Sequence, residues 1–155
     1  MQKQKIQVIS EIRYAIRLCQ RTARLYRNIQ TTGTFLTIVG GSATITALAK
    51  NLPDDIAIIG TGLLALAGAA LIAIRPADKA AANENDVKRY QAILAKSAAM
   101  SVDELQQAVE EAHISDAPEI EAMRSIAYND VVKELNRLDC IEKLSFFQSI
   151  LAKIA

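Results

Sequence analysis

The fold of this 155-residue chain is decided by the stretch Asp54–Pro76, which reads DDIAIIGTGLLALAGAALIAIRP. From Ile56 to Ile74 it contains nineteen consecutive uncharged residues. A bilayer core about 30 Å thick is crossed by roughly 20 apolar residues of α-helix. The stretch is therefore predicted to be a membrane-spanning helix. The alternative is the buried helix of a small soluble bundle.

A second uncharged run, residues 33–49 (GTFLTIVGGSATITALA), precedes this helix and is less apolar because five Ser and Thr residues dilute it. Only six residues, KNLPDD, separate the two runs, so two helices here must be antiparallel. The glycines of these runs would each cost about 1 kcal/mol in a water-exposed helix, whereas glycine is common in membrane helices. We therefore predict a transmembrane hairpin over 33–75, with spans at about 33–49 and 56–74.

Lys and Arg residues flank the hairpin unevenly. Four arginines precede the first span, Arg75 and Lys79 follow the second, and the connecting loop holds only Lys50. Because cytoplasmic flanks carry the excess of Lys and Arg, both termini are predicted to be cytoplasmic in a multi-pass protein of the inner (cytoplasmic) membrane. The lipid bilayer is then a partner, and the arginines expected to face anionic lipid headgroups are Arg17, Arg21, Arg24 and Arg27.

Composition favours an all-α fold, because Ala, Leu and Ile dominate and no run alternates as a strand does. Residues 1–32 hold seven basic side chains and one acidic one, and residues 80–155 hold eight basic and thirteen acidic ones. The first segment is predicted to be a basic amphipathic helix, either on the membrane surface or packed against the cytosolic part. Its apolar seam comprises Ile9, Ile12, Ile16, Cys19, Ala23 and Tyr26.

Residues 76–155 are predicted to form a cytosolic module of four helices. The first follows Pro76 and has Val87, Tyr90 and Leu94 on one side. A capping box, Ser101 to Glu104, opens the second, which runs to about residue 112. The third is expected to begin at Asp116 as N-cap and to continue from residue 119 to residue 138, and the fourth spans 141–154. About 75 residues form a small core, so a homo-oligomer is expected.

Small and hydroxyl-bearing residues recur at helical spacing along both predicted spans. Such stripes permit close helix contact in lipid, and a hydroxyl-bearing face could also line a polar path in an oligomer. The plainer interpretation is packing, with each hydroxyl bonded to the carbonyl one turn earlier. The path or packing candidates are Thr34, Thr37, Gly41 and Thr44 on the first span and Thr61, Ala65, Ala69 and Ala73 on the second.

No sequence pattern indicates an enzyme or a cofactor. His113 is the only histidine, and no cysteine lies near it at metal-ligand spacing, so a metal site is not expected. Cys19 and Cys140 are far apart and suit a reducing compartment. Phosphate-binding glycine loops of the nucleotide-binding types are also missing. The chain is therefore predicted to be non-enzymatic.

Basic groups of the cytosolic module are candidates for an anionic ligand. Lys88, Arg89 and Tyr90 combine two cations with an aromatic ring that could stack on a base. The plainer interpretation is that Lys and Arg on exposed helices bind nothing specific, although symmetry in a ring of subunits would multiply one weak patch. Duplex DNA is not an expected partner. The full candidate set is Lys88, Arg89, Tyr90, Lys96, Arg124, Lys133 and Arg137.

The order of these elements resembles a group of known proteins. A basic helix leads through RLYRNIQTTGTFLTIVGG into the hairpin that ends LALAGAALIAIRP, and NDVKRYQAIL and an acidic helical tail follow. This layout is similar to the SLATT-type two-transmembrane effectors and to other small two-span effectors of prokaryotic antiviral defence, including those attached to CRISPR signalling. The resemblance implies a cytosolic part that senses a signal, often a cyclic oligonucleotide, and an oligomeric membrane part that compromises the inner membrane.

Two other functions fit the same sequence. The chain could be a membrane-anchored interaction protein whose acidic tail docks a cytosolic partner. It could also be a holin-like lysis protein, although its long cytosolic tail argues against that class.

Overall fold

The computed structural model describes residues 2–40, 50 and 54–155, and every regular element among them is a helix. These residues form two compact units. Unit 1 comprises Met1–Leu25 and Lys79–Ala155, and unit 2 comprises Tyr26–Asp78. The N-terminal helix and the C-terminal region, which the sequence analysis treats as separate domains, thus belong to one unit.

A local side-chain motif marks the start of α5, as predicted. Ser101 opens α5 with the predicted capping box: its Oγ accepts the Glu104 N–H at 3.3 Å, and Glu104 Oε2 accepts the Ser101 N–H at 2.8 Å. The α-helices are α1 (Gln2–Gly40), α3 (Asp54–Ile74), α4 (Pro76–Lys96), α5 (Val102–Ile114), α6 (Arg124–Glu134) and α7 (Phe146–Ile154), with 3₁₀ turns at Glu121–Met123 and Leu138–Cys140.

Two predicted helix boundaries in the C-terminal region are wrong. The helix expected to reach residue 138 ends at Glu134, because Asn136 has a φ of +55° and closes a Schellman motif. In that motif the Arg137 N–H donates to the Val132 carbonyl at 2.9 Å. The last helix begins at Phe146 and not at residue 141. A second capping box, which pairs Ser145 with Gln148, opens it.

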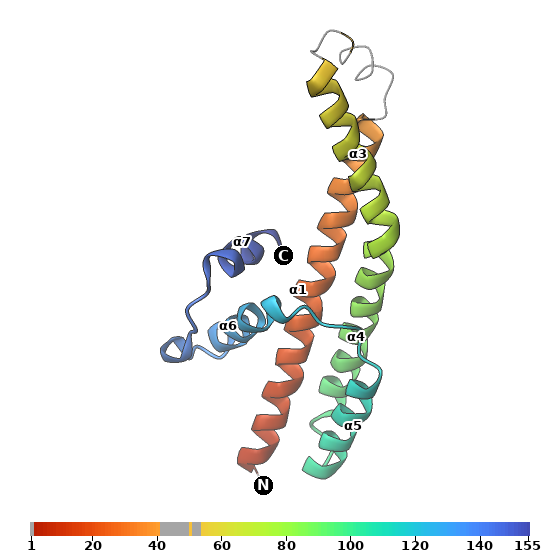
Figure 1. The fold of residues 1–155 in the computed structure, drawn as a ribbon. Coiled ribbons are helices and arrows are strands. Elements are labelled where there is room, and N and C mark those ends of the chain that lie inside the picture. Colours follow the sequence, from red (N-terminus) through yellow and green to blue (C-terminus); the bar gives the residue numbers. More distant parts are fainter. Residues whose placement is uncertain (1, 41–49, 51–53) are drawn as a thin grey trace. The chain divides into compact units, whose positions relative to one another are not determined.

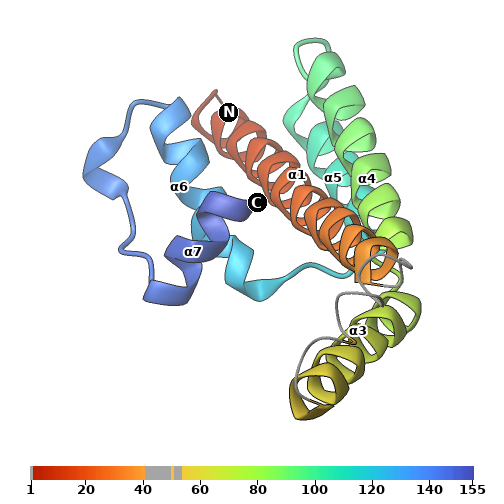
Figure 2. The same cartoon turned by 90° about the horizontal axis from the view of Figure 1, so that it is seen from above.

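The N-terminal half of α1 lies between two apolar clusters of unit 1. On one face Ile12 packs with Tyr90 of α4 and Leu105 of α5, and all three side chains are fully buried. On the other face Leu18 packs with Met123 and with Leu151 of α7. Figures 1 and 2 show α4 and α5 beside one face of this part of α1, and α6 and α7 beside the other.

This arrangement decides between the two interpretations of the N-terminal helix. Its predicted seam, which includes Ile12 and Ile16, is buried against α4 and α5 and is not free to lie on a membrane surface. The sequence pattern identified only this face. The second face, which includes Leu18 and Leu25, was missed because Arg17 and Arg21 lie beside these leucines and interrupt the apolar spacing.

Arginines of α1 fix α6 and α7 to the second face. Arg21 binds Asp130 through two hydrogen bonds, at 2.7 and 3.0 Å, and donates a third to the Ala152 carbonyl at 3.1 Å. Arg17 donates to Glu134 at 2.8 Å. These partly exposed pairs each contribute on the order of 1 kcal/mol or less, but together they select the position of α6 along α1.

Unit 2 packs residues 26–40 of α1 antiparallel to α3. A Cβ atom built on Gly33 would lie 2.7 Å from Leu71 Cδ2, and one built on Gly40 would collide with Leu64. The side chain of Thr37 approaches Gly68 between these contacts. The small residues of α1 therefore provide room for the leucines of α3.

Most of the other described side chains of α3 are exposed. The exposed fraction is 70% for Ile58, 68% for Leu66 and 81% for Ile72. α3 ends at Ile74, because Arg75 precedes a proline and such a residue avoids the right-handed α region. Arg75 has a φ of +51°, and α4 then starts at Pro76 as predicted.

One helical segment among the described residues, Ile58–Lys96, is long and apolar enough to cross a membrane. The most apolar part of this segment is not buried by other residues. The rest of the expected hairpin is described only in part. Residues 41–49 of the first predicted span, with Gly41 and Thr44, lie outside the described residues.

Candidate functional site

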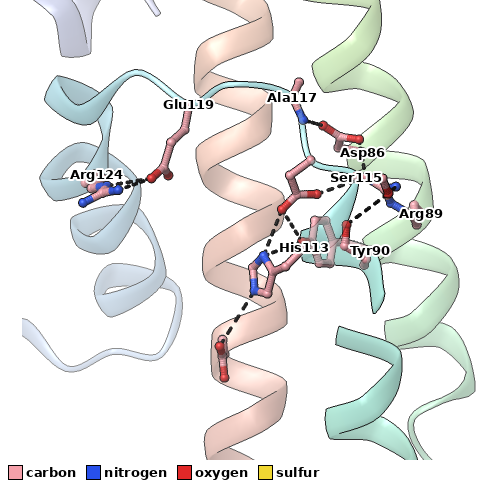
Figure 3. Close-up of polar contacts among 11 residues, drawn as sticks. Asp86, Arg89, Tyr90, His113, Ser115, Ala117, Glu119 and Arg124 are labelled. Atoms are coloured by element: carbon pink, nitrogen blue, oxygen red, sulfur yellow. Dashed lines mark hydrogen bonds and ion pairs between the residues drawn. The ribbon is translucent and has the colours of Figure 1, made fainter. Parts of the chain in front are cut away.

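Asp116 contacts several side chains of a polar network in unit 1, and Figure 3 labels its partners Arg89, Tyr90 and His113. Its Oδ2 accepts a hydrogen bond from the Tyr90 hydroxyl at 2.5 Å and lies 2.9 Å from His113 Nδ1. Its Oδ1 accepts a hydrogen bond from Arg89 at 3.0 Å. The carboxylate therefore joins the end of α5 to the middle of α4.

Arg89 extends this network to a second carboxylate. It pairs with Asp86, one turn earlier on α4, and donates to the Ser115 hydroxyl. Asp86 also accepts the backbone N–H of Ala117 at 2.8 Å. One arginine and two aspartates thus fix the connection between α5 and the 3₁₀ turn that precedes α6.

The predicted N-cap role of Asp116 is wrong. Residues 116–120 are not helical, and the next helical turn starts at Glu121. The Asp116 side chain instead accepts hydrogen bonds from Tyr90 and Arg89, which lie more than 25 residues earlier in the chain. A carboxylate with charged and buried donors gains more from them than from one helix N–H.

A cavity of about 520 Å³ opens beside this network within unit 1. Its walls are mostly apolar, from α1 on one side and the connection at Ala117 and Pro118 on the other. His113 and Asp116 lie at its edge, and Arg124, which pairs with Glu119, also lines it. The α1 residues of the lining are Glu11, Tyr14, Ala15, Leu18 and Cys19.

Burial favours the protonated form of the thiol and phenol side chains in and beside the cavity. Burial, with the charges of Asp86 and Asp116 as smaller causes, raises the pKa of Cys19 to about 12. Burial and the hydrogen bond to Asp116 raise the pKa of Tyr90, and burial followed by the charge of Glu119 raises that of Tyr14. A thiol with so high a pKa is a poor nucleophile at neutral pH, so the cavity is better suited to binding than to nucleophilic catalysis.

Metal binding has no support in the geometry. Across residues 2–40 and 54–155, no group of three or more His, Cys, Asp or Glu side chains is placed to hold a metal ion. His113 Nε2 faces Glu11 at 3.9 Å, and its Nδ1 faces Asp116, so both ring nitrogens point at carboxylates within unit 1.

The seven predicted ligand-binding residues do not meet in one place. Tyr90 is fully buried, so its ring presents no face for stacking. The three arginines all pair with carboxylates. Arg89 pairs with Asp86 and Asp116, Arg124 pairs with Glu119, and Arg137 pairs with Asp139. The three lysines Lys88, Lys96 and Lys133 are exposed on α4 and α6. Lys133 borders a hollow of about 500 Å³ with Arg17, Arg21 and Arg24.

The candidates for headgroups and for a polar path are also distributed. Arg17 and Arg21 are engaged by α6, whereas Arg24 and Arg27 are exposed. Thr37 donates its hydroxyl to the Gly33 carbonyl at 2.8 Å, the packing alternative, and Thr34 accepts a hydrogen bond from Gln30 at 2.9 Å. The stripe of Thr61, Ala65, Ala69 and Ala73 on α3 is exposed and lies off the contact with α1.

Sequence reasoning identified Arg89 and Tyr90 but missed their acceptors. A local signal existed for Asp86, because Asp86, Arg89 and Tyr90 lie at helical spacing on one face of α4. Asp116 carried a misleading local signal, since an Asp shortly before a Pro resembles a helix start. Its real partners depend on how α5 folds back on α4.

The comparisons with known proteins give no further identification. No family model, no curated protein and no solved structure matches this chain.

Proposed function

We propose that this chain is a non-enzymatic membrane effector: a transmembrane hairpin carrying a helical unit that responds to a signal. In this proposal residues 33–49 and 56–74 cross the inner membrane, and both termini are cytoplasmic. By its resemblance to two-span effectors of antiviral defence, the response would be loss of membrane integrity in an infected cell.

The observation that carries the proposal is the outward face of α3. Ile58, Leu66 and Ile72 are each more than two-thirds exposed. Burying one such side chain is favourable by roughly 1.5–3 kcal/mol, so a helix with a whole face of them is unfavourable in water. Hydrocarbon removes that penalty, and the absence of charge from Ile56 to Ile74 permits it.

The cavity at Tyr14 and Cys19 is the proposed place for the signal. Two of its walls belong to α1 and to the connection after α5, and α1 continues without a break to Gly40. A ligand that moves α1 by a fraction of a turn would shift the part of this helix that packs on α3. The effect would be a population shift and not a chemical step.

The charges of the cavity favour one class of signal. Three carboxylates, Glu11, Asp116 and Glu119, line it against Arg124 and His113. Such a lining suits a neutral or cationic small molecule with apolar surface better than a cyclic oligonucleotide, which brings several negative charges.

The test is expression of the intact chain in bacteria, scored by entry of a membrane-impermeant dye and by phage plating. Infected cells expressing the chain should take up dye and yield fewer plaques. A variant with Cys19→Trp, which fills the cavity, should stay in the membrane but lose the response to infection. Membrane retention without dye entry or plaque loss in any condition would contradict the effector role and favour a membrane-anchored interaction protein.

A further inference from the structure

The C-terminal region of unit 1 presents a protruding apolar surface. Phe146 and Phe147, in the first turn of α7, are 84% and 62% exposed, and Ile150 lies one turn later on the same side, also exposed. We call these three residues the apolar knob. Singly exposed apolar residues are ordinary, but adjacent phenylalanines left in water indicate an interface.

The knob is held firmly by the rest of unit 1. The adjoining face of α7 places Leu151 and Ala155 in the core. The segment before α7 is fixed by Asn129, a buried side chain that donates to the Glu142 carbonyl at 2.9 Å and accepts the Glu142 N–H at 2.8 Å. The phenylalanines are thus presented on a supported helix and not on a loose tail.

The same unit contains a concave apolar surface. A mostly apolar hollow of about 350 Å³ opens between α1 and α6. We call it the apolar hollow. Its principal lining residues are Tyr14, Tyr128, Val131, Val132, Leu135 and Cys140.

We propose that the apolar knob of one copy of this chain docks in the apolar hollow of a second copy. A knob and a hollow on one chain are complementary between copies. The contact gives a symmetric dimer where each knob fills the other copy's hollow, and a ring or a filament where the contact runs head to tail. Anchoring in one membrane would raise the effective concentration of copies. The inference supplies the subunit contact that the proposed effector needs, but it does not depend on a signal or on antiviral activity.

A lipid surface fits these features less well. A bilayer offers nothing to insert into a concave hollow. Residues 137–143, which join the hollow to the knob, hold two basic and two acidic side chains, and this segment therefore offers no net positive charge to anionic headgroups. In a protein interface such groups form the usual polar rim.

Cys140 makes the proposal directly testable, because it lines the hollow. Two differently tagged full-length chains, both with Cys19→Ala, are expressed together. One retains Cys140 as its only thiol. The other has Cys140→Ser and carries Phe146→Cys or, in a parallel sample, Phe147→Cys. Oxidation in isolated membranes should give a mixed disulfide dimer for at least one of the two knob positions, since a disulfide needs Cα atoms within about 7 Å.

The matched control carries Gln106→Cys in place of the knob cysteine, on the exposed face of α5. We expect at least tenfold more mixed dimer from a knob position than from this control. Equal yields from both knob positions and the control would overturn the proposal, as would strong quenching of a knob-bound dye by brominated lipids. Alkaline extraction of the same membranes separates the two proposals: missing cross-links in a chain that resists extraction contradict only the docking, and cross-links in a chain that is washed off contradict only the membrane effector.

Discussion

Units 1 and 2 place the same kinds of side chain in opposite surroundings. In unit 1, Leu105 is fully buried between α5 and α1. In unit 2, Leu66 is 68% exposed in the middle of α3. Both are leucines inside α-helices, so helix propensity does not separate them. Unit 1 buries apolar side chains such as Leu105 between its own helices, whereas the described residues of unit 2 leave many apolar side chains of α3 exposed.

The difference is also visible in how each unit uses charge. Unit 1 binds its helices together with Arg21–Asp130 and with the Arg89 network. From Ile58 to Ile74, α3 has no ionisable side chain at all. Its contact with α1 depends on Gly33 and Gly40, as helix contacts in lipid commonly do.

The largest expected effect is the difference in stability between alanine substitutions at the two leucines. Leu105→Ala should lower the free energy of unfolding of unit 1 by about 2–5 kcal/mol, because it removes buried contacts and leaves a cavity. For about 100 residues this lowers the Tm by roughly 10 °C or more. Leu66→Ala should change it little. Thermal unfolding of the chain in detergent, followed by circular dichroism, compares the two, and equal shifts would contradict the distinction.

A charge placed on an exposed apolar position should affect membrane insertion in unit 2 but not in unit 1. Leu66→Lys should weaken membrane insertion by about 2.5–3.5 kcal/mol, since lysine is disfavoured at the centre of a membrane helix. Ile114→Lys, at a still more exposed position of unit 1, should have no effect on insertion. The fraction of each variant that resists alkaline extraction measures this. Full retention of Leu66→Lys would mean that α3 does not lie in hydrocarbon.

The Asp116 network offers a smaller test within unit 1. Asp116→Asn removes the charged acceptor of the buried Tyr90 hydroxyl and one of the two carboxylates that pair with Arg89, and it should cost about 1–3 kcal/mol. Asp103→Asn, on the exposed first turn of α5, is the control and should cost less than 1 kcal/mol. Thermal unfolding at neutral pH distinguishes them. An Asp116→Asn chain as stable as the control would show that the network contributes nothing.

Part of this fold could be predicted from the sequence. Features set by a local motif could be predicted, whereas a helix end that depends on the φ of one residue could not. The Ser101–Glu104 box is local and was identified correctly; the Ser145–Gln148 box gives the same signal but was passed over in favour of the apolar spacing from residue 141. The end of α6 depends on Asn136 adopting a positive φ, which the sequence permits but does not require.

The candidate site was less accessible, because its contacts are long-range. Arg89 and Tyr90 were identified as candidates for an anionic ligand, and the sequence did not indicate their contacts within the chain. Their acceptor, Asp116, is brought to them only when α5 packs antiparallel on α4. The cavity likewise needs the second apolar face of α1, which no single helical period reveals.

Alkaline pH should weaken unit 1 in a way that depends on Cys19. Its pKa is raised from 9.0 to about 12 in the folded chain, so the unfolded chain releases its proton first. The stability associated with the neutral thiol is thus complete below pH 9 and is lost as the pH rises toward 12. Cys19→Ala should flatten this part of the pH dependence of Tm. An unchanged slope would show that the thiol is not selectively protonated in the folded state.

The smallest expected effect concerns two glycines of unit 2. Gly33→Ala forces Leu71 to move and should loosen the contact between α1 and α3 by about 1 kcal/mol or less. Gly62→Ala meets no atom within 4 Å and should, if anything, strengthen α3 through its higher helix propensity. Hydrogen exchange of the α3 amides in detergent reports both, and faster exchange only in Gly62→Ala would reverse the account.

The central claim is that α3 lies in hydrocarbon while unit 1 lies in water. It is tested most directly by labelling cysteines with a membrane-impermeant maleimide in inverted vesicles, using chains with Cys19→Ala and Cys140→Ser. A chain with Ile114→Cys should be labelled at once, and a chain with Leu66→Cys should be labelled only after detergent is added. Equal labelling of both chains in intact vesicles would contradict the account.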